Sequence, residues 1–109
     1  MRPDPNQFLP LAPAALHILL ALSAQDLHGY GIMQDVQRQT EGRLRLGPGT
    51  LYDNLARLLK NGLVAESGED ERRRYYRLTA FGKKVLGAEV VRLETVIRDA
   101  RASLAFGRS

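Results

Sequence analysis

Hydrophobic residues in this chain recur at helical spacing in four segments. Residues 11–24 are apolar on nearly every side, which is typical of a helix buried in a core. From Gly29 to about Thr40 the apolar positions narrow to a stripe, as in an amphipathic helix. A third helix is expected from Pro48 to about Asn61, with Gly62 as its left-handed C-terminal cap. Thr79 can cap a fourth helix that continues to about Ala105, because no proline interrupts it.

Strand-like patterns occupy the stretch between the third and fourth helices. Leu63–Ser67 and Arg73–Leu78 flank the polar turn Gly68–Glu71 and predict an antiparallel hairpin. In its second strand Tyr76 and Leu78 should face the core. The connector Glu41–Gly47 alternates leucine with arginine and is compatible with a very short strand. The predicted fold class is mostly α with a small β-hairpin, followed by a long C-terminal helix.

The length of 109 residues suits one domain with a single modest core. We expect a flexible N-terminal arm at 1–10, a helical domain with its hairpin at 11–78, the long helix at 79–105 and a tail at 106–109. The chain has no cysteine, which removes disulfides and zinc–thiolate sites, and its formal net charge of +4 is compatible with a polyanionic partner. The longest apolar run is too short to span a bilayer, so we expect a cytoplasmic protein without a membrane partner.

The third helix carries the first candidate binding surface. A helical wheel places its leucines on one side, Tyr52 at the border, and Thr50, Asp53, Asn54, Arg57 and Lys60 on the outward side. These groups can contact base edges and phosphates in a major groove. The first turn, at Pro48 and Gly49, adds free backbone N–H groups that favour an anion. Taken alone, the pattern also fits an ordinary amphipathic helix with a solvated face.

The hairpin carries the second candidate surface, because Arg72, Arg73 and Arg74 form the densest positive cluster in the chain. A basic hairpin beside a recognition helix can lay arginines on a DNA backbone or in a minor groove. The alternative is a solvated cationic strand paired with the acidic turn, whose carboxylates would repel phosphates at the hairpin tip.

The last helix shows a heptad-like seam with spacings of four and three, which is typical of helices that pack side by side. Its length exceeds what a core of this size needs to cover, so we expect it to form a two-fold dimer. The alternative is that the seam packs against the first helix of its own chain. The predicted interface residues are Leu86, Val90, Leu93, Ile97, Ala100 and Leu104.

Catalytic and metal sites find no support in the sequence. His17 lies in an apolar helix without carboxylates at ligand spacing, so we expect a hydrogen-bonded structural role. The segment Gly47–Thr50 lacks the lysine of a phosphate-binding loop, and no nucleophile–base arrangement is apparent. We therefore expect no enzyme, no metal and no cofactor.

Three segments together resemble the PadR family of transcription regulators. They are His28–Ile32, Gly47–Tyr52 with Leu55, Leu58 and Gly62–Val64, and Arg73–Thr79 with Gly82. The resemblance implies a winged helix-turn-helix with the third helix in the major groove and the hairpin as wing. It also implies a dimer through the last helix and repression released by a small molecule. By position, Thr50 and Tyr52 match groove- and phosphate-contacting residues, Tyr30 a residue near the backbone, and Arg73 and Arg74 the basic wing.

The functional hypothesis is a dimeric DNA-binding transcriptional regulator that reads a pseudo-palindromic operator. An effector, if one acts, is expected between the first and last helices near Leu16 and Leu93. The alternative is a winged-helix protein-interaction module that does not read DNA. Such a module would carry apolar residues at Thr50, Asn54 or Arg57, and this chain does not.

Overall fold

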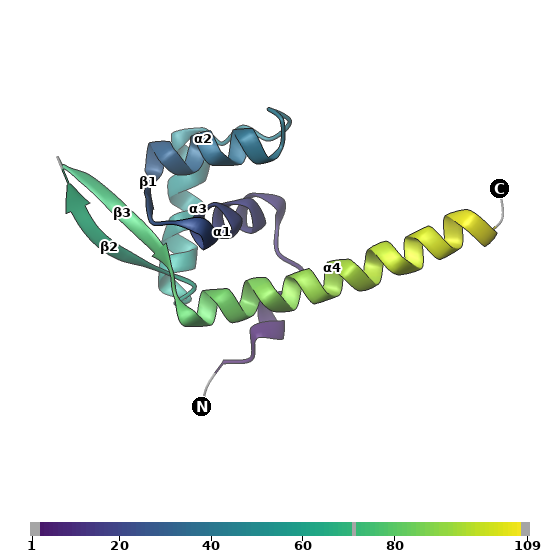
Figure 1. Cartoon of the computed structure of the whole chain (residues 1–109). Coiled ribbons are helices and arrows are strands. Elements are labelled where there is room, and N and C mark those ends of the chain that lie inside the picture. Colours follow the sequence, from purple (N-terminus) through teal and green to yellow (C-terminus); the bar gives the residue numbers. More distant parts are fainter. Residues whose placement is uncertain (1–2, 71, 108–109) are drawn as a thin grey trace.

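The computed structural model describes residues 3–70 and 72–107, so the ends of the predicted arm and tail and Glu71 of the predicted turn lie outside it. Side chains of Glu69 and Asp70 are not described. Three helices precede a hairpin and a long last helix that projects from them (Figure 1). The elements are η1 (Pro5–Phe8), α1 (Pro13–Ala24), β1 (Leu27–His28), α2 (Gly29–Gln39), α3 (Pro48–Lys60), β2 (Val64–Asp70), β3 (Arg73–Leu78) and α4 (Ala80–Phe106).

The core lies between α1, α2, α3 and the first turns of α4. Helix α1 is buried on several sides, as its continuous apolar sequence predicts, and Ile18 and Leu19 have no exposed surface. Helices α2 and α3 contribute the narrower apolar stripes expected of amphipathic helices, for example Ile32 and Leu55. The remaining buried hydrophobic residues are Ala21, Leu22, Val36, Leu46, Leu51, Leu58, Leu63, Val64, Tyr76, Val85 and Leu86.

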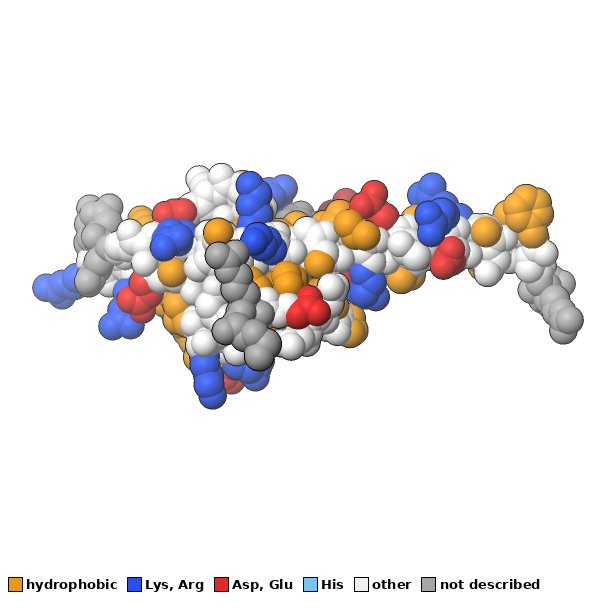
Figure 2. Space-filling view, turned by 90° about the horizontal axis from the view of Figure 1, so that it is seen from below, with side chains coloured by type: hydrophobic (Ala, Val, Ile, Leu, Met, Phe, Trp, Pro, Cys, Tyr) orange, Lys and Arg blue, Asp and Glu red, His pale blue; other side chains and the backbone are white. Residues whose placement is uncertain are grey.

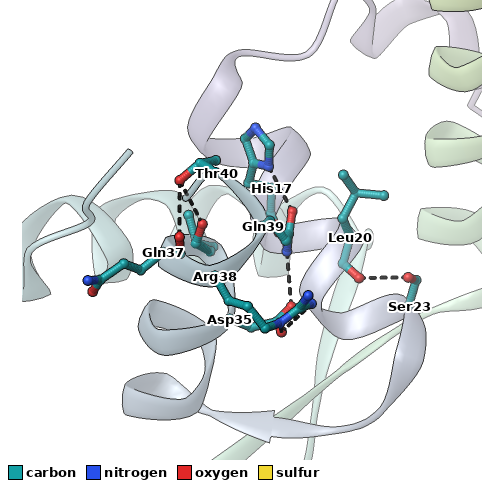
Figure 3. Close-up of polar contacts among 9 residues, drawn as sticks. His17, Leu20, Ser23, Asp35, Gln37, Arg38, Gln39 and Thr40 are labelled. Carbon is teal, nitrogen blue, oxygen red and sulfur yellow. Dashed lines mark hydrogen bonds and ion pairs between the residues drawn. The ribbon is translucent and has the colours of Figure 1, made fainter. Parts of the chain in front are cut away.

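Polar contacts tie α1 to the end of α2 (Figure 3). The Nδ1 atom of His17 lies 2.7 Å from Oε1 of Gln39, and the Gln39 amide donates to the His17 carbonyl and to Asp35. Arg38 closes the network with an ion pair to Asp35 at 2.8 Å. The expected structural role of His17 is thus confirmed as a hydrogen bond between two helices.

The sheet has three strands in the order β1–β3–β2, all antiparallel, rather than the two of the predicted hairpin. The added strand is β1, whose Leu27 and His28 pair with Tyr76 and Tyr75. The suggestion of a short strand within Glu41–Gly47 is wrong, because this segment forms turns and extended backbone without a strand partner among the described residues. Strand β2 also runs three residues further than predicted, with a bulge between Glu66 and Gly68.

The N-terminal segment differs from the loose arm that its prolines predict. Residues Pro5–Phe8 form the 3-10 helix η1, and Phe8 packs edge-on against Phe81 of α4 with ring centroids 5.7 Å apart. The backbone N–H of Leu11 donates to a carboxylate oxygen of Glu89 at 2.7 Å. Pro5 lies in the first turn of η1, where a proline is tolerated because its missing N–H would have no partner. The prolines of this segment are therefore compatible with a short helix.

The junction between β3 and α4 is tightly built. The Thr79 hydroxyl accepts the N–H of Gly82, which confirms the predicted N-cap, and donates to the Gly62 carbonyl at 2.6 Å. Gly62 has the positive φ of +76° expected of a left-handed cap. Gly82 lies against the Leu63 carbonyl, where a side chain would collide with backbone. These contacts fix the direction in which α4 leaves the sheet.

Candidate nucleic-acid interface

Helix α3 presents the polar face that the sequence predicts. Gly47 precedes it in extended conformation, Pro48 occupies its first turn, and no side chain caps that end within the described residues. Three leucines turn to the core. Most positions predicted at the start and on the outward face of the helix are exposed. They are Pro48, Gly49, Thr50, Tyr52, Asp53, Arg57 and Lys60.

Asn54 is a correction to the predicted surface. Only 8% of this residue is exposed, and its Nδ2 donates to the Thr50 carbonyl at 2.8 Å. Leu51 and Leu58 lie three residues before it and four after it, which puts all three on the same side of the helix. The prediction that Asn54 faces outward is therefore wrong, and its amide serves the backbone of its own helix.

The start of α2 lies against α3. His28 caps α2, because its Nδ1 accepts the N–H of Gly31 at 3.1 Å. A side chain at Gly29 would collide with the Tyr52 hydroxyl, so the absence of a Cβ lets α3 approach this closely. Tyr30 and Tyr52 remain 60% and 50% exposed. The predicted residues Tyr30 and Tyr52 therefore come from neighbouring parts of α2 and α3.

The hairpin exposes its predicted arginines. Arg72, Arg73 and Arg74 are all exposed, and Arg72 has a positive φ of 69° at the turn. Arg74 pairs with Glu66 across the hairpin at 3.4 Å, whereas Arg73 contacts the His28 ring at 3.1 Å. The cationic groups therefore reach from the hairpin toward the start of α2.

Tyr76 anchors the hairpin in the core, as its alternation with Tyr75 predicts. It is buried, and this burial raises the pKa of its hydroxyl, with a further contribution from the nearby Tyr52 hydroxyl. Tyr75 on the opposite side packs on the His28 ring with centroids 5.3 Å apart. Tyr75 and His28 are paired across β3 and β1, so their side chains lie on the same face of the sheet.

The predicted seam of α4 divides into two parts. Leu86 is buried in the core of its own chain, so its assignment to a dimer interface is wrong, and Leu93 is half-buried. Val90, Ile97, Ala100 and Leu104 are exposed, with 86% of Leu104 accessible. Beyond the seam, the structure also exposes Val91, Val96 and Phe106, which the spacing of four and three did not include.

The C-terminal part of α4 projects beyond the other helices (Figure 1). Figure 2 shows hydrophobic side chains between charged ones along this projection and one at its far end. Apolar side chains at this density on a helix without a neighbour are typical of a surface that another chain covers. The exposed fraction rises along the helix, from 42% at Val90 to 86% at Leu104 and 91% at Phe106.

Glu89 is the one fully buried carboxylate described in α4. It accepts hydrogen bonds from the Leu11 N–H and from Nε of Arg92, the latter at 2.5 Å. The hydrogen bond from Arg92 holds the pKa of Glu89 below its usual range, although burial acts in the opposite direction and the Leu11 N–H assists. This group was not singled out from the sequence, since an isolated acidic residue in a helix carries no distinguishing pattern.

The cavities do not coincide with the predicted effector site. One of about 670 Å³ lies between the end of α1 and the start of α4, lined by residues such as Leu22, Lys83 and Val90. Neither Leu16 nor Leu93 lines it. A site between those two leucines stays a prediction.

Two further classes of site were tested on the described residues. Among them, no group of three histidine or acidic side chains is arranged to hold a metal ion. Nor does any helix in residues 3–70 and 72–107 combine the length and apolar character that crossing a membrane requires.

A three-helix core with a three-stranded wing and a long last helix is a winged helix-turn-helix. The model of the transcriptional regulator PadR-like family matches residues 18–88. A transcriptional regulator of Mycobacterium tuberculosis is 33% identical over 91 residues, which cover 81% of this chain and 82% of that protein. The chain belongs to the PadR-like family of transcriptional regulators.

Two solved structures share this fold, and a further relative matches in sequence. A transcriptional regulator from Clostridium thermocellum has 30% identity and a TM-score of 0.72, covering 82% of this chain and 87% of that one. A PadR family regulator from Clostridium difficile, at 24% identity and a TM-score of 0.74, covers 85% and 99% and supports the fold alone. An uncharacterised transposon protein of Streptomyces fradiae is 42% identical over 76 residues, which are 70% of this chain but 21% of that protein.

Proposed function

We propose that this chain binds duplex DNA as a homodimer, with α3 in the major groove and the β2–β3 hairpin as its wing, and acts as a repressor. The observation that carries the proposal is the exposed polar face of α3 beside exposed arginines of β3. Thr50, Tyr52 and Arg57 offer hydroxyl and cationic groups to base edges and phosphates. Arg72, Arg73 and Arg74 supply positive charge along one flank.

The dimer would form through the exposed apolar part of α4. Val90, Ile97 and Leu104 continue the heptad-like spacing beyond the core and would meet the same residues of a second copy. Two-fold symmetry would then present two α3 helices to a pseudo-palindrome with half-site centres roughly 34 Å apart. An effector between Leu16 and Leu93 would act at this dimer contact and lower the affinity for DNA.

The deciding experiment selects duplexes from a random-sequence library on the immobilised protein. Fluorescence anisotropy then compares the selected duplex with a scrambled one at two salt concentrations. We expect tighter binding of the selected duplex at both salts, and a selected sequence with inverted half-sites.

Two other outcomes would contradict this function. Equal binding of both duplexes that vanishes with salt would leave only a basic surface. Failure to enrich any sequence would favour the interaction module, whose partner would then be a protein. Screening of small molecules for loss of the anisotropy signal tests the effector separately.

A further inference from the structure

The His28 side chain joins three elements at the base of the wing. It belongs to β1 and caps α2, and its ring packs against Tyr75 of β3. Its second nitrogen, Nε2, lies 3.1 Å from a guanidinium nitrogen of Arg73, also on β3. The imidazole therefore has one nitrogen turned to the backbone of α2 and the other to an exposed cation.

Both neighbours of the ring are donors, and this determines where its proton lies. The Gly31 N–H can only donate, and so can the guanidinium group of Arg73, whereas a neutral imidazole has a single acceptor nitrogen. The Gly31 N–H is fixed in the first turn of α2, while the Arg73 side chain is exposed and able to turn. Nδ1 is therefore the acceptor, and Nε2 carries the hydrogen.

This arrangement leaves two hydrogen-bond donors side by side. An Nε2–H and a guanidinium N–H at 3.1 Å cannot satisfy each other, but both can donate to one anionic oxygen placed between them. Neither group has an acceptor to offer, so the pair suits an anionic oxygen such as that of a phosphate.

The surroundings identify the source of that oxygen. Tyr52 of α3 lies against Gly29, the residue next to His28, so the start of α2 that His28 caps lies against α3. A DNA backbone that follows α3 in a major groove would pass the same place on its way to the wing.

We infer that His28 and Arg73 together clamp one backbone phosphate of the bound duplex, His28 as a neutral donor and Arg73 as the cation. This inference rests on the proposed function and adds to it a contact made by a residue outside the recognition helix and the arginine cluster. The contact fixes the register of α2 and the wing on the DNA.

The first test separates the donor role of His28 from its role as a cap. His28→Ser keeps an oxygen that can accept the Gly31 N–H, since serine is a preferred N-cap, but it removes Nε2–H. We expect roughly tenfold weaker binding of the selected duplex, because a hydrogen bond to a charged group is lost. The salt dependence should stay unchanged, since a neutral donor releases no counterion. His28→Thr repeats the test if His28→Ser unfolds more easily than wild type.

Arg73→Ala should weaken binding and also lower the salt slope by about 0.9. Arg101→Ala is the matched control, because it removes one exposed positive charge from the far part of α4 and should leave the affinity nearly unchanged.

The second test locates the phosphate and distinguishes it from free anions. Duplexes with a single uncharged methylphosphonate at successive positions should lose affinity for wild type at several phosphates. At one of these per half-site the loss should be smaller in both His28→Ser and Arg73→Ala, and inorganic phosphate at millimolar concentration should not mimic it.

The outcomes separate the two proposals. A wild-type chain that binds the duplex with the same affinity as His28→Ser overturns the clamp alone. The clamp is also overturned if His28→Ser and Arg73→Ala are sensitive to different methylphosphonates. A wild-type chain that enriches no duplex overturns the proposed function and the clamp with it.

Discussion

Replacing Gly82 with alanine should destabilise the chain through a contact at the base of α4. A Cβ at this position would overlap the Leu63 carbonyl oxygen, and it would lie 2.9 Å from the Leu63 carbonyl carbon and 2.8 Å from Cδ1 of Leu78. The leucine side chain can turn away, but the carbonyl cannot, because it also accepts the N–H of Thr79 at 3.1 Å. The first turn of α4 would therefore have to move away from the sheet.

The magnitude follows from two opposing effects. Forcing an added carbon into filled space costs about 1–3 kcal/mol, whereas alanine in a helix gains about 0.5–1 kcal/mol over glycine. The net loss should be up to about 2.5 kcal/mol and centred near about 1 kcal/mol, and each kcal/mol corresponds to about 4–8 °C in the melting temperature of a domain near this size.

Gly87 supplies the matched control within the same helix. Nothing lies within 4 Å of a Cβ built there, so Gly87→Ala should raise the free energy of unfolding by about 0.5–1 kcal/mol. Urea unfolding followed by circular dichroism measures both variants at one protomer concentration, because the proposed dimer would make stability depend on concentration. If Gly82→Ala is as stable as Gly87→Ala, the close approach of α4 to Leu63 is not as described.

Three further predictions concern other contacts. Ile97→Asp should give a monomer in sedimentation, because a charge would be buried between two α4 helices, and a dimer that survives would place the interface elsewhere. Glu89→Gln should lower the free energy of unfolding at pH 7. Because the pKa of Glu89 is lowered in the folded chain, its carboxylate stabilises the fold only while it is charged. The difference in stability between Glu89→Gln and wild type should therefore shrink below about pH 4.5. In urea unfolding across that pH range, a constant difference would contradict this role. Phe8→Ala should cost about 0.5–1.5 kcal/mol through loss of the aromatic pair with Phe81, and an unchanged urea midpoint would show that η1 contributes nothing to stability.

Elements that depend on local pattern could be predicted from the sequence. The four helices, the hairpin and the cap at Thr79 follow from periodicity and from residues next to one another in the chain. Strand β1 could not be predicted this way, because two residues show no alternation and its pairing with β3 joins segments nearly fifty residues apart. The packing of η1 depends on Phe81 in the same manner, and no local rule connects them.

The candidate site was predictable in its charge and only partly in its geometry. Exposed arginines and the polar face of α3 follow from composition and a helical wheel. Asn54 was predicted on the outward side, although its spacing from Leu51 and Leu58 puts it on the buried side of the helix. Its hydrogen bond to the Thr50 carbonyl, which lets a polar amide be buried there, is not visible in the sequence pattern. Leu86 shares the spacing of the exposed seam, and only the fold determines that the core ends between Leu86 and Val90. The role of His28 could not be predicted from the sequence, because it depends on the contacts of its two ring nitrogens with Gly31 of α2 and Arg73 of β3.

The stiff junction at Thr79 makes α4 a lever arm. The helix has 27 residues, so it is about 40 Å long, and its first turn is bonded to the sheet that carries the wing. A tilt of about 3° at its far end would displace the wing by about 2 Å, which is comparable to the tolerance of a hydrogen bond to DNA. In the proposed dimer, small changes where two such arms cross would therefore misalign the opposite ends, without any rearrangement inside the domain proposed to bind DNA.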